Sequence, residues 1–263
     1  MSALPSSLAS GSGGVPLVML HGMGSTAEIW LPQLNHFGRS RLALAWTQPG
    51  FGPSPALETL GWDSLADSLE SLLQALDIGK AHILGHSIGG MVAQEFYHRH
   101  PQRVASLVLS ATSAAFGSSD PQWKQEFIRQ RTDAMAQYSS FAQAAPTLLS
   151  GFMSPECTPA LREMASTAAR EISTERYLDA MRLLVTFNRK AELGAIAVPT
   201  LLLAGELDTQ APPKGMKRMA EQIPNAQFQE IPAVRHMANL EAPHAFNQII
   251  ENFLSAQSQP AHA

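Results

Sequence analysis

The sequence predicts an α/β fold, with a mostly parallel sheet, helices on both of its faces and an inserted helical subdomain. Two patterns in the 263 residues lead to this prediction. Short apolar runs alternate with helical patterns along most of the chain, as in folds built from parallel strands and crossover helices. The alternation stops at residues 116–193, where only helical patterns cut by prolines occur. We therefore expect a core from residues 15–115 and 194–256, with the helical subdomain at residues 116–193.

Six apolar runs are the expected strands, and they lie at residues 15–20, 42–46, 81–84, 104–109, 198–204 and 226–231. Between them, leucines recur at helical spacing over residues 65–76. A second helix is expected over residues 87–100, because Pro101 stops it. The Ser- and Gly-rich residues 1–14 are expected to form a flexible leader, and residues 257–263 a flexible tail.

The composition argues against several classes of protein. The formal net charge is −4, which disfavours a surface for nucleic acid. No run approaches the roughly 20 apolar residues of a membrane span, and the N-terminal segment lacks the basic and apolar regions of a signal peptide. We therefore expect a cytoplasmic protein that binds neither nucleic acid nor a membrane. No motif indicates a metal or another cofactor, so we expect none.

The segment GHSIGG at residues 85–90 is the motif that carries the chemistry. It follows an apolar strand and opens a helix, which is the setting of the G-x-S-x-G nucleophile turn. Gly85 and Gly89 are small because a side chain at either position would collide with neighbouring backbone in a strained turn. Ser87 is therefore the predicted nucleophile, held above the sheet near the free N–H groups of the following helix.

A serine nucleophile needs a base, and the base needs an orienting acid. His236 is the predicted base, because it follows an expected strand at the rim of the sheet, where open α/β folds bind ligands. Asp208 follows the preceding strand and is the predicted acid, while Glu206 is interpreted as a solvated turn residue. His86 adjoins Ser87, but its side chain is expected to point away from the site.

Negative charge that develops on an attacked carbonyl needs backbone N–H donors. One predicted donor is the N–H of Ile88, directly after the nucleophile. The second is expected in the loop HGMG at residues 21–24, where the flanking glycines let the N–H of Met23 turn inward. We therefore predict an oxyanion hole formed by Met23 and Ile88.

The sequence resembles the α/β-hydrolase superfamily over residues 15–254. The matching stretches are VPLVMLHGMGS, HILGHSIGGMVAQEF, VPTLLLAGELDTQAPP and HMANLEAPHAF. Within the superfamily, the sequence is most similar to 3-oxoadipate enol-lactone hydrolases and the small carboxylesterases beside them. The resemblance implies a helical cap at residues 116–193, a triad of Ser87, Asp208 and His236, and the oxyanion donors Met23 and Ile88.

Two departures from the superfamily's pattern concern the first part of the chain. Many relatives carry an aspartate where Thr47 stands, in the segment TQPGFGPS. A hydroxyl caps a turn less strongly than a carboxylate, so the shape of this loop is an open point. The leader is short and polar for the usual first hairpin, so we expect about six strands rather than eight.

The predicted function is hydrolysis of a carboxylic ester or lactone through an acyl-enzyme, with 3-oxoadipate enol-lactone as one candidate substrate. Three alternatives stay open: a carbon–carbon bond hydrolase of ring-cleavage products, a cofactor-free perhydrolase, and a ligand receptor on the same fold. A haloalkane dehalogenase and an epoxide hydrolase are disfavoured because both need an aspartate at position 87. The expected partner is a small-molecule substrate, and a homodimer is left open.

The expected cap offers two kinds of substrate contact. Trp123 and Phe127 lie four residues apart on one helix face and are candidates to line the roof of the site, with packing in the core of the cap as the alternative. An anionic substrate would need cationic partners, most of which are interpreted here as solvated helix faces. The cations of the expected cap are Lys124, Arg129, Arg131, Arg162, Arg170, Arg176 and Arg182.

Overall fold

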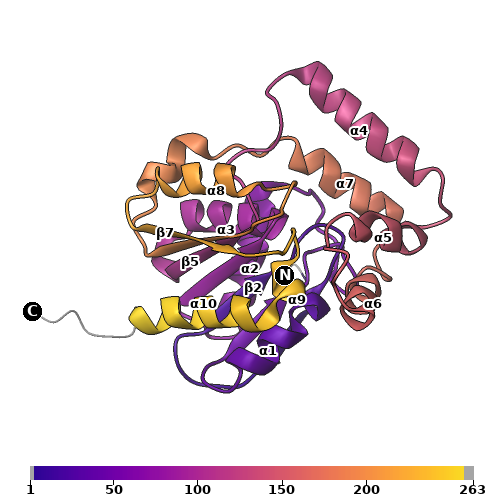
Figure 1. The fold of residues 1–263 in the computed structure, drawn as a ribbon. Helices are drawn as coiled ribbons and strands as arrows, with labels where there is room; N and C mark the ends of the chain where they lie inside the picture. The colour runs from indigo at the N-terminus through magenta and orange to yellow at the C-terminus, as the bar shows by residue number, and fades with distance from the viewer. Residues whose placement is uncertain (1–2, 258–263) are drawn as a thin grey trace, which may run out of the picture.

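The computed structural model describes residues 3–257, which are built around one sheet (Figure 1). Residues 1–2 of the expected leader and 258–263 of the expected tail lie outside this range. Within the described residues the sheet has seven strands in the order β1-β3-β2-β4-β5-β6-β7. Strand β1 is antiparallel to β3, and the other neighbouring pairs are parallel, which confirms the predicted α/β class. The strands are β1 Ser7–Ser10, β2 Leu17–Leu20, β3 Ala43–Trp46, β4 Ala81–His86, β5 Val104–Ser110, β6 Thr200–Gly205 and β7 Ala226–Ile231.

Strand β1 shows that the expected strand count was wrong, and it lies inside the expected leader. Its sequence SLAS contains two serines and none of its residues is fully buried, so it carries no apolar strand pattern. The strand forms because its backbone pairs with the edge of β3, with Ser7 opposite Trp46. Two hydrogen bonds hold the residue before the strand, Ser6. The Thr47 N–H donates to the Ser6 carbonyl at 2.7 Å, and the Ser6 N–H donates to the Ser54 hydroxyl at 2.8 Å. Backbone pairing, and not side-chain burial, therefore places this segment.

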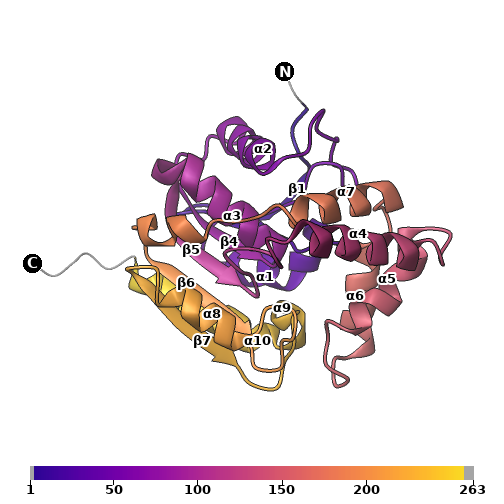
Figure 2. The same ribbon diagram turned by 90° about the horizontal axis from the view of Figure 1, so that it is seen from above.

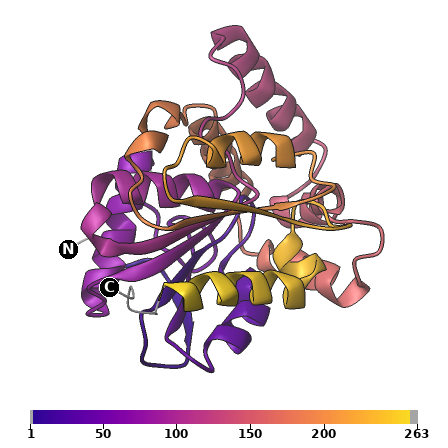
Figure 3. The ribbon, with the colours of Figure 1, turned by 60° about the vertical axis from the view of Figure 1, so that its left-hand side comes forward.

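Helices cover both faces of the sheet (Figure 3). One face carries α1, α9 and α10, and the other carries α2, α3 and α8. Along β2, Leu17 and Met19 pack on the first face, and Val18 and Leu20 pack on the second. No helix among the described residues is both long and apolar enough to cross a lipid bilayer. The helices of the two faces are α1 Leu31–Phe37, α2 Trp62–Ala75, α3 Ile88–Arg99, α8 Pro213–Ala220, α9 Ala238–Glu241 and α10 Pro243–Ala256.

Residues 116–193, all of which the structure describes, form helices and no strand. Figures 1 and 2 show these helices gathered to one side of the sheet, and Figure 1 shows α4 projecting away from it. Three of them begin at side chains that accept a backbone N–H bond, namely Asp120, Ser140 and Ser173. We call α4 to α7 the cap. Its helices are α4 Pro121–Met135, α5 Phe141–Ser150, α6 Pro159–Ala168 and α7 Thr174–Leu184, and the short helix η3 Lys190–Ala195 follows them.

The loop after β3 is closed by Thr47, the residue that departs from the superfamily's pattern. Its side chain is buried, and its hydroxyl accepts the Ala27 N–H at 3.1 Å. Its carbonyl accepts the Ser54 hydroxyl at 2.6 Å. A threonine therefore holds this loop with neutral hydrogen bonds where many relatives carry a carboxylate.

Candidate active site

Ser87 lies at a sharp turn between β4 and α3. Its backbone has φ 54° and ψ −120°, a strained conformation for a residue with a side chain. A Cβ atom on Gly85 would collide with the Gly89 carbonyl, and a Cβ atom on Gly89 would collide with the Leu20 carbonyl. The Thr112 hydroxyl supports the turn by donating to the Ser87 carbonyl at 2.7 Å. The turn therefore has the close backbone contacts that its two glycines indicated.

His236 and Asp208 lie together at the same end of the sheet. Asp208 follows β6, His236 follows β7, and the His236 Nδ1 atom lies 2.8 Å from the Asp208 Oδ2 atom. The other carboxylate oxygen, Oδ1, accepts the N–H groups of Gln210 at 2.7 Å and Ala211 at 3.1 Å. Because an ionised carboxylate can only accept, the Nδ1 atom carries a proton and Nε2 is left as the basic nitrogen.

Asp208 and Glu206 are the two carboxylates after β6, and only Asp208 reaches the histidine. Glu206 is exposed and accepts the Ala233 N–H at 2.8 Å. Burial on its own raises the pKa of Asp208, but the hydrogen bond and charge of His236 outweigh burial and hold this pKa below its ordinary value. Asp208 is therefore ionised at neutral pH, as an orienting acid must be.

The loop that carries His236 is anchored to the cap as well as to the sheet. The His236 N–H donates to the Phe152 carbonyl at 3.0 Å. One carboxylate oxygen of Glu241 accepts the Ser154 N–H at 2.6 Å, and the other accepts the Arg235 N–H at 3.1 Å. The position of the basic nitrogen thus depends on both parts of the molecule.

The loop after β2 carries Met23, and His21 fixes the shape of this loop. The His21 Nδ1 atom donates to the Gly22 carbonyl at 2.8 Å, while Nε2 accepts the Gln48 N–H at 2.9 Å. A carbonyl can only accept and an N–H can only donate, so these two bonds require a neutral ring. Burial lowers the pKa of His21 to about 4, which keeps the ring neutral. Ile88 begins α3, where the first N–H groups have no acceptor within the helix.

A cavity of about 350 Å³ brings these groups together. Ser87, His236, Met23 and Ile88 all lie on its wall. A volume of this size suits a small organic molecule. The rest of the wall is mainly apolar, and its cap residues include Phe127, Phe141, Leu148, Leu149, Phe152, Tyr177, Met181 and Leu184.

Two expectations about this cavity are wrong. Trp123 is not among the described residues of the wall: it is 36% exposed, and its ring stacks on Phe127, which does reach the cavity. His86 does not point away but lies on the wall, with its ring centroid 4.9 Å from that of His236. Its ring also lies edge-on to that of Trp30, with the centroids 6.4 Å apart. Burial first, and the charge of His236 second, lower the pKa of His86 to about 3.

Sequence reasoning missed several polar groups on the cavity wall. Ser25, Gln210 and Tyr177 lie on it, and the buried Ser25 hydroxyl has no hydrogen-bond partner among the described residues. Arg131 also lies on the wall, although the sequence could not distinguish it from the other cap cations. One signal was available: Phe127 and Arg131 are four residues apart, so they share one helix face. The Arg131 guanidinium indeed lies 4.9 Å from the centroid of the Phe127 ring.

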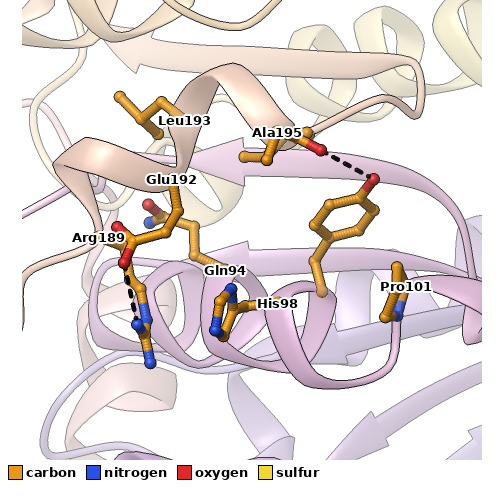
Figure 4. A pocket seen from close by; sticks show the side chains of 9 residues that line it. Gln94, His98, Pro101, Arg189, Glu192, Leu193 and Ala195 are labelled. Carbon is orange, nitrogen blue, oxygen red and sulfur yellow. Dashed lines mark hydrogen bonds and ion pairs between the residues drawn. The ribbon is translucent and has the colours of Figure 1, made fainter.

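A second, smaller cavity of about 170 Å³ lies between α3 and η3 (Figure 4). The Tyr97 hydroxyl there donates to the Ala195 carbonyl at 3.4 Å. Arg189 pairs with Glu95 at 2.6 Å and with Glu192 at 3.2 Å, so its charge is neutralised within the protein.

Over the described part of the chain, no group of three or more His, Cys, Asp or Glu side chains could hold a metal ion.

Comparison with known proteins identifies the family of this chain. The family model of the alpha/beta hydrolase fold matches residues 15–243. The chain belongs to the alpha/beta-hydrolase family. This match confirms the predicted family and fold, and the hydrolases among its relatives place the chain in the hydrolase class of enzymes.

Three similar proteins illustrate this relationship. A putative carbamate hydrolase RutD from Stutzerimonas stutzeri (strain A1501) is 29% identical over 246 residues, which cover 92% of each chain. A thermophilic esterase from Thermogutta terrifontis is 25% identical, with a TM-score of 0.88 over 97% of this chain and 94% of that chain. The enol-lactonase from Burkholderia xenovorans LB400 is 22% identical, with a TM-score of 0.84 over 95% of this chain and 96% of that one. At that identity, the enol-lactonase supports the shared fold alone.

Proposed function

We propose that this hydrolase cleaves a carboxylic ester or lactone, with Ser87 as the nucleophile, His236 as the base and Asp208 as the orienting acid. The observation that carries the proposal is the 2.8 Å pair between His236 and Asp208 beside a cavity wall that also holds Ser87 in its strained turn. A histidine oriented by a carboxylate on one side, with a serine on the other, is the arrangement used for acyl transfer.

The proposed reaction has two halves. In the first, His236 Nε2 takes the Ser87 proton while the serine oxygen attacks the carbonyl carbon, and the N–H groups of Met23 and Ile88 stabilise the resulting oxyanion. Collapse breaks the bond to the leaving oxygen, which receives the proton from His236, and the acyl group stays on Ser87. In the second half, a water molecule deprotonated by His236 attacks the acyl carbon. The bond to the Ser87 oxygen then breaks, that oxygen takes the proton back from His236, and the acid is released. Asp208 stabilises the protonated imidazole in both halves.

Two observations support an ester or lactone as the substrate. A solved relative of 25% sequence identity is named as an esterase. The apolar cavity of about 350 Å³ has room for a small acyl group or lactone ring. 3-Oxoadipate enol-lactone is one such substrate. A carbamate belongs in the same substrate panel, because its carbonyl can be attacked in the same way and a relative is named as a putative carbamate hydrolase.

The experiment that tests the proposal compares the wild type with Ser87→Ala on p-nitrophenyl acetate and p-nitrophenyl butyrate. We expect turnover by the wild type and an acyl-enzyme burst, both abolished in the variant. Equal activity of the two proteins would overturn the assignment of the nucleophile. Saturable binding of both esters, with turnover slower than about 10⁻³ s⁻¹, would favour a receptor over an enzyme, since enzymes typically turn over at 1–10³ s⁻¹.

A further inference from the structure

We infer that Arg131 binds a carboxylate on the substrate, so that the enzyme prefers esters or lactones that carry a negative charge away from the scissile bond. This inference rests on the proposed function, because it assigns the substrate class of the same cavity. It concerns a specificity-determining residue of the cap, supplied by α4.

Arg131 differs from the other arginines at residues 116–193 in having no partner. Among the described residues it has no ion pair and no hydrogen bond, and its contact is the face of the Phe127 ring. Each of the others already has an acceptor in the protein. The pairs are Arg129 with Glu126 and Asp133, Arg162 with the Ser154 and Cys157 carbonyls, Arg170 with Glu163, Arg176 and Arg182 with Asp179, and Arg189 with Glu95 and Glu192.

The position of Arg131 directs its free charge to the catalytic cavity. Arg131 and Phe127 share one face of α4, and both lie on the cavity wall with Ser87 and His236. Helix α4 packs against α7, which supplies Tyr177 to the same wall (Figures 1 and 2). An unpaired guanidinium on a half-buried wall is a ready donor for a planar carboxylate.

Tyr177 provides a second donor close to this charge. Its ring is 6% exposed and stacks on Phe141 with centroids 4.4 Å apart. Its hydroxyl donates to no acceptor among the described residues. Burial raises the pKa of Tyr177, and the nearby charge of Arg131 offsets only part of that rise, so the hydroxyl stays protonated and able to donate. Both groups lie on the wall of the same cavity, and each has a donor free for a ligand.

The cavity wall also lacks a compensating negative charge. None of the described residues that line it is an aspartate or a glutamate. Asp208 is paired with His236, and burial keeps His86 neutral. The fixed charge on the wall is therefore that of Arg131. A wall of this sign attracts an anionic substrate and disfavours a cationic one.

The test uses pairs of esters that differ only in charge. Monoethyl succinate, glutarate and adipate are each compared with the ethyl ester of the same chain in which an amide replaces the free carboxylate. We expect the wild type to prefer the acid over the amide for at least one chain length, with a ratio of kcat/KM of about 10 or more, as a charged hydrogen bond supplies. Arg131→Met should remove this preference, because it should raise KM for the acid far more than KM for the amide.

Three controls separate recognition from a general effect on the cap. Arg131→Lys should restore part of the preference, because it keeps the charge and loses the planar fork. Arg129→Met, which removes an exposed arginine of the same helix, should leave the ratio unchanged. Binding of free glutarate and adipate, measured by calorimetry, should be saturable in the wild type and lost in Arg131→Met, and this readout needs no turnover.

The outcomes for the two proposals are distinguishable. Serine-dependent hydrolysis without any preference for the acid, or a preference that survives Arg131→Met, overturns the role of Arg131 and leaves the proposed function intact. An equal loss for acid and amide in Arg131→Met also overturns it, since that result indicates a structural role. Hydrolysis that does not depend on Ser87 overturns the proposed function instead. Absence of both hydrolysis and dicarboxylate binding overturns both.

Discussion

Arg131 and Arg189 each lie beside a cavity, and they differ in whether the protein supplies a partner for their charge. Arg189, beside the smaller cavity of Figure 4, pairs with the Glu95 carboxylate, whose side chain is 3% exposed, and with Glu192. Arg131, on the wall of the larger cavity, has no such pair within the described residues and stacks on Phe127. The ion pairs of Arg189 stabilise the fold around the smaller cavity. The unpaired Arg131 leaves the larger cavity with a charge that a ligand can neutralise.

The largest expected difference between the two cavities is in catalysis. One polar side chain of each cavity is replaced, and kcat is measured for both variants. Ser87→Ala should lower kcat on p-nitrophenyl butyrate by about 10⁴ or more, because loss of a nucleophile leaves only binding and oxyanion stabilisation. His98→Gln, a change in the wall of the smaller cavity, should leave kcat within about twofold. If Ser87→Ala lowers kcat by less than about tenfold, the larger cavity is not the catalytic site.

The next largest effect is expected at the acid behind the base. Asp208→Asn should lower kcat by about 10³–10⁴, because an amide can donate to Nδ1 and so stabilise the wrong tautomer of His236. Glu206→Gln, on the same loop but bonded to the Ala233 N–H, is the matched control and should retain most of the activity. The steady-state rates of the two variants decide between them, and the assignment is wrong if Glu206→Gln is the more damaging change.

For the free energy of unfolding, Arg189 should matter more than Arg131, the opposite of their expected effects on substrate binding. Arg189→Met leaves the buried Glu95 carboxylate without its partner and should lower the free energy of unfolding by about 3 kcal/mol. Arg131→Met breaks no ion pair and should change this free energy by less than about 0.5 kcal/mol. Urea denaturation with a constant m-value measures both. Equal losses would mean that Arg131 is a structural residue of the cap.

The last expected effect is a loss of stability in acid that comes from three buried histidines. Burial lowers the pKa of His21 to about 4, that of His82 to about 4 and that of His86 to about 3. Below pH 6.5 these histidines therefore bind protons in the unfolded chain but not in the folded protein. The free energy of unfolding is unaffected by them above about pH 6.5 and decreases as the pH falls towards 4. The free energy of unfolding, measured with urea, should follow this course, with a loss of about 2 kcal/mol per histidine at pH 5.

A variant at the far end of β4 shows whether the larger cavity dominates this acid sensitivity. His82, whose Nδ1 atom lies 2.8 Å from the Ser106 hydroxyl, stands at the opposite end of the strand from His86. His82→Gln keeps a hydrogen-bonding group without a titrating ring, so it should reduce the decrease between pH 6.5 and 4.5. An unchanged decrease would place the effect at His21 and His86, and a flat profile in the wild type would contradict the burial argument.

Several elements of the site could be predicted because their causes are local. The glycines of GHSIGG indicated the turn at Ser87, since the colliding atoms belong to residues close by in the chain or in the next strand. The strand-ending positions of Asp208 and His236 followed from the alternation of strands and helices. Their 2.8 Å contact depends on the neighbouring positions of β6 and β7 in the sheet, which parallel connectivity favours.

Other elements could not be predicted, because their causes are contacts between distant segments. The direction of His86 depends on packing against Trp30, and the outward position of Trp123 depends on how α4 meets the core. Strand β1 has no pattern of its own and exists through the backbone edge of β3. The free charge of Arg131 is visible only after the acceptors of the other arginines have been assigned.

By itself, then, the sequence determined the α/β class, the strained turn at Ser87 and the positions of Asp208 and His236 directly after strands. Each of these is set by the periodicity or the side-chain size of residues adjacent in the chain. Tertiary structure alone decided which histidine rings are buried, which cations are neutralised and which residues face the cavity. Burial and charge pairing depend on distances through space, and such distances exist only once the sheet, its helices and the cap have packed together.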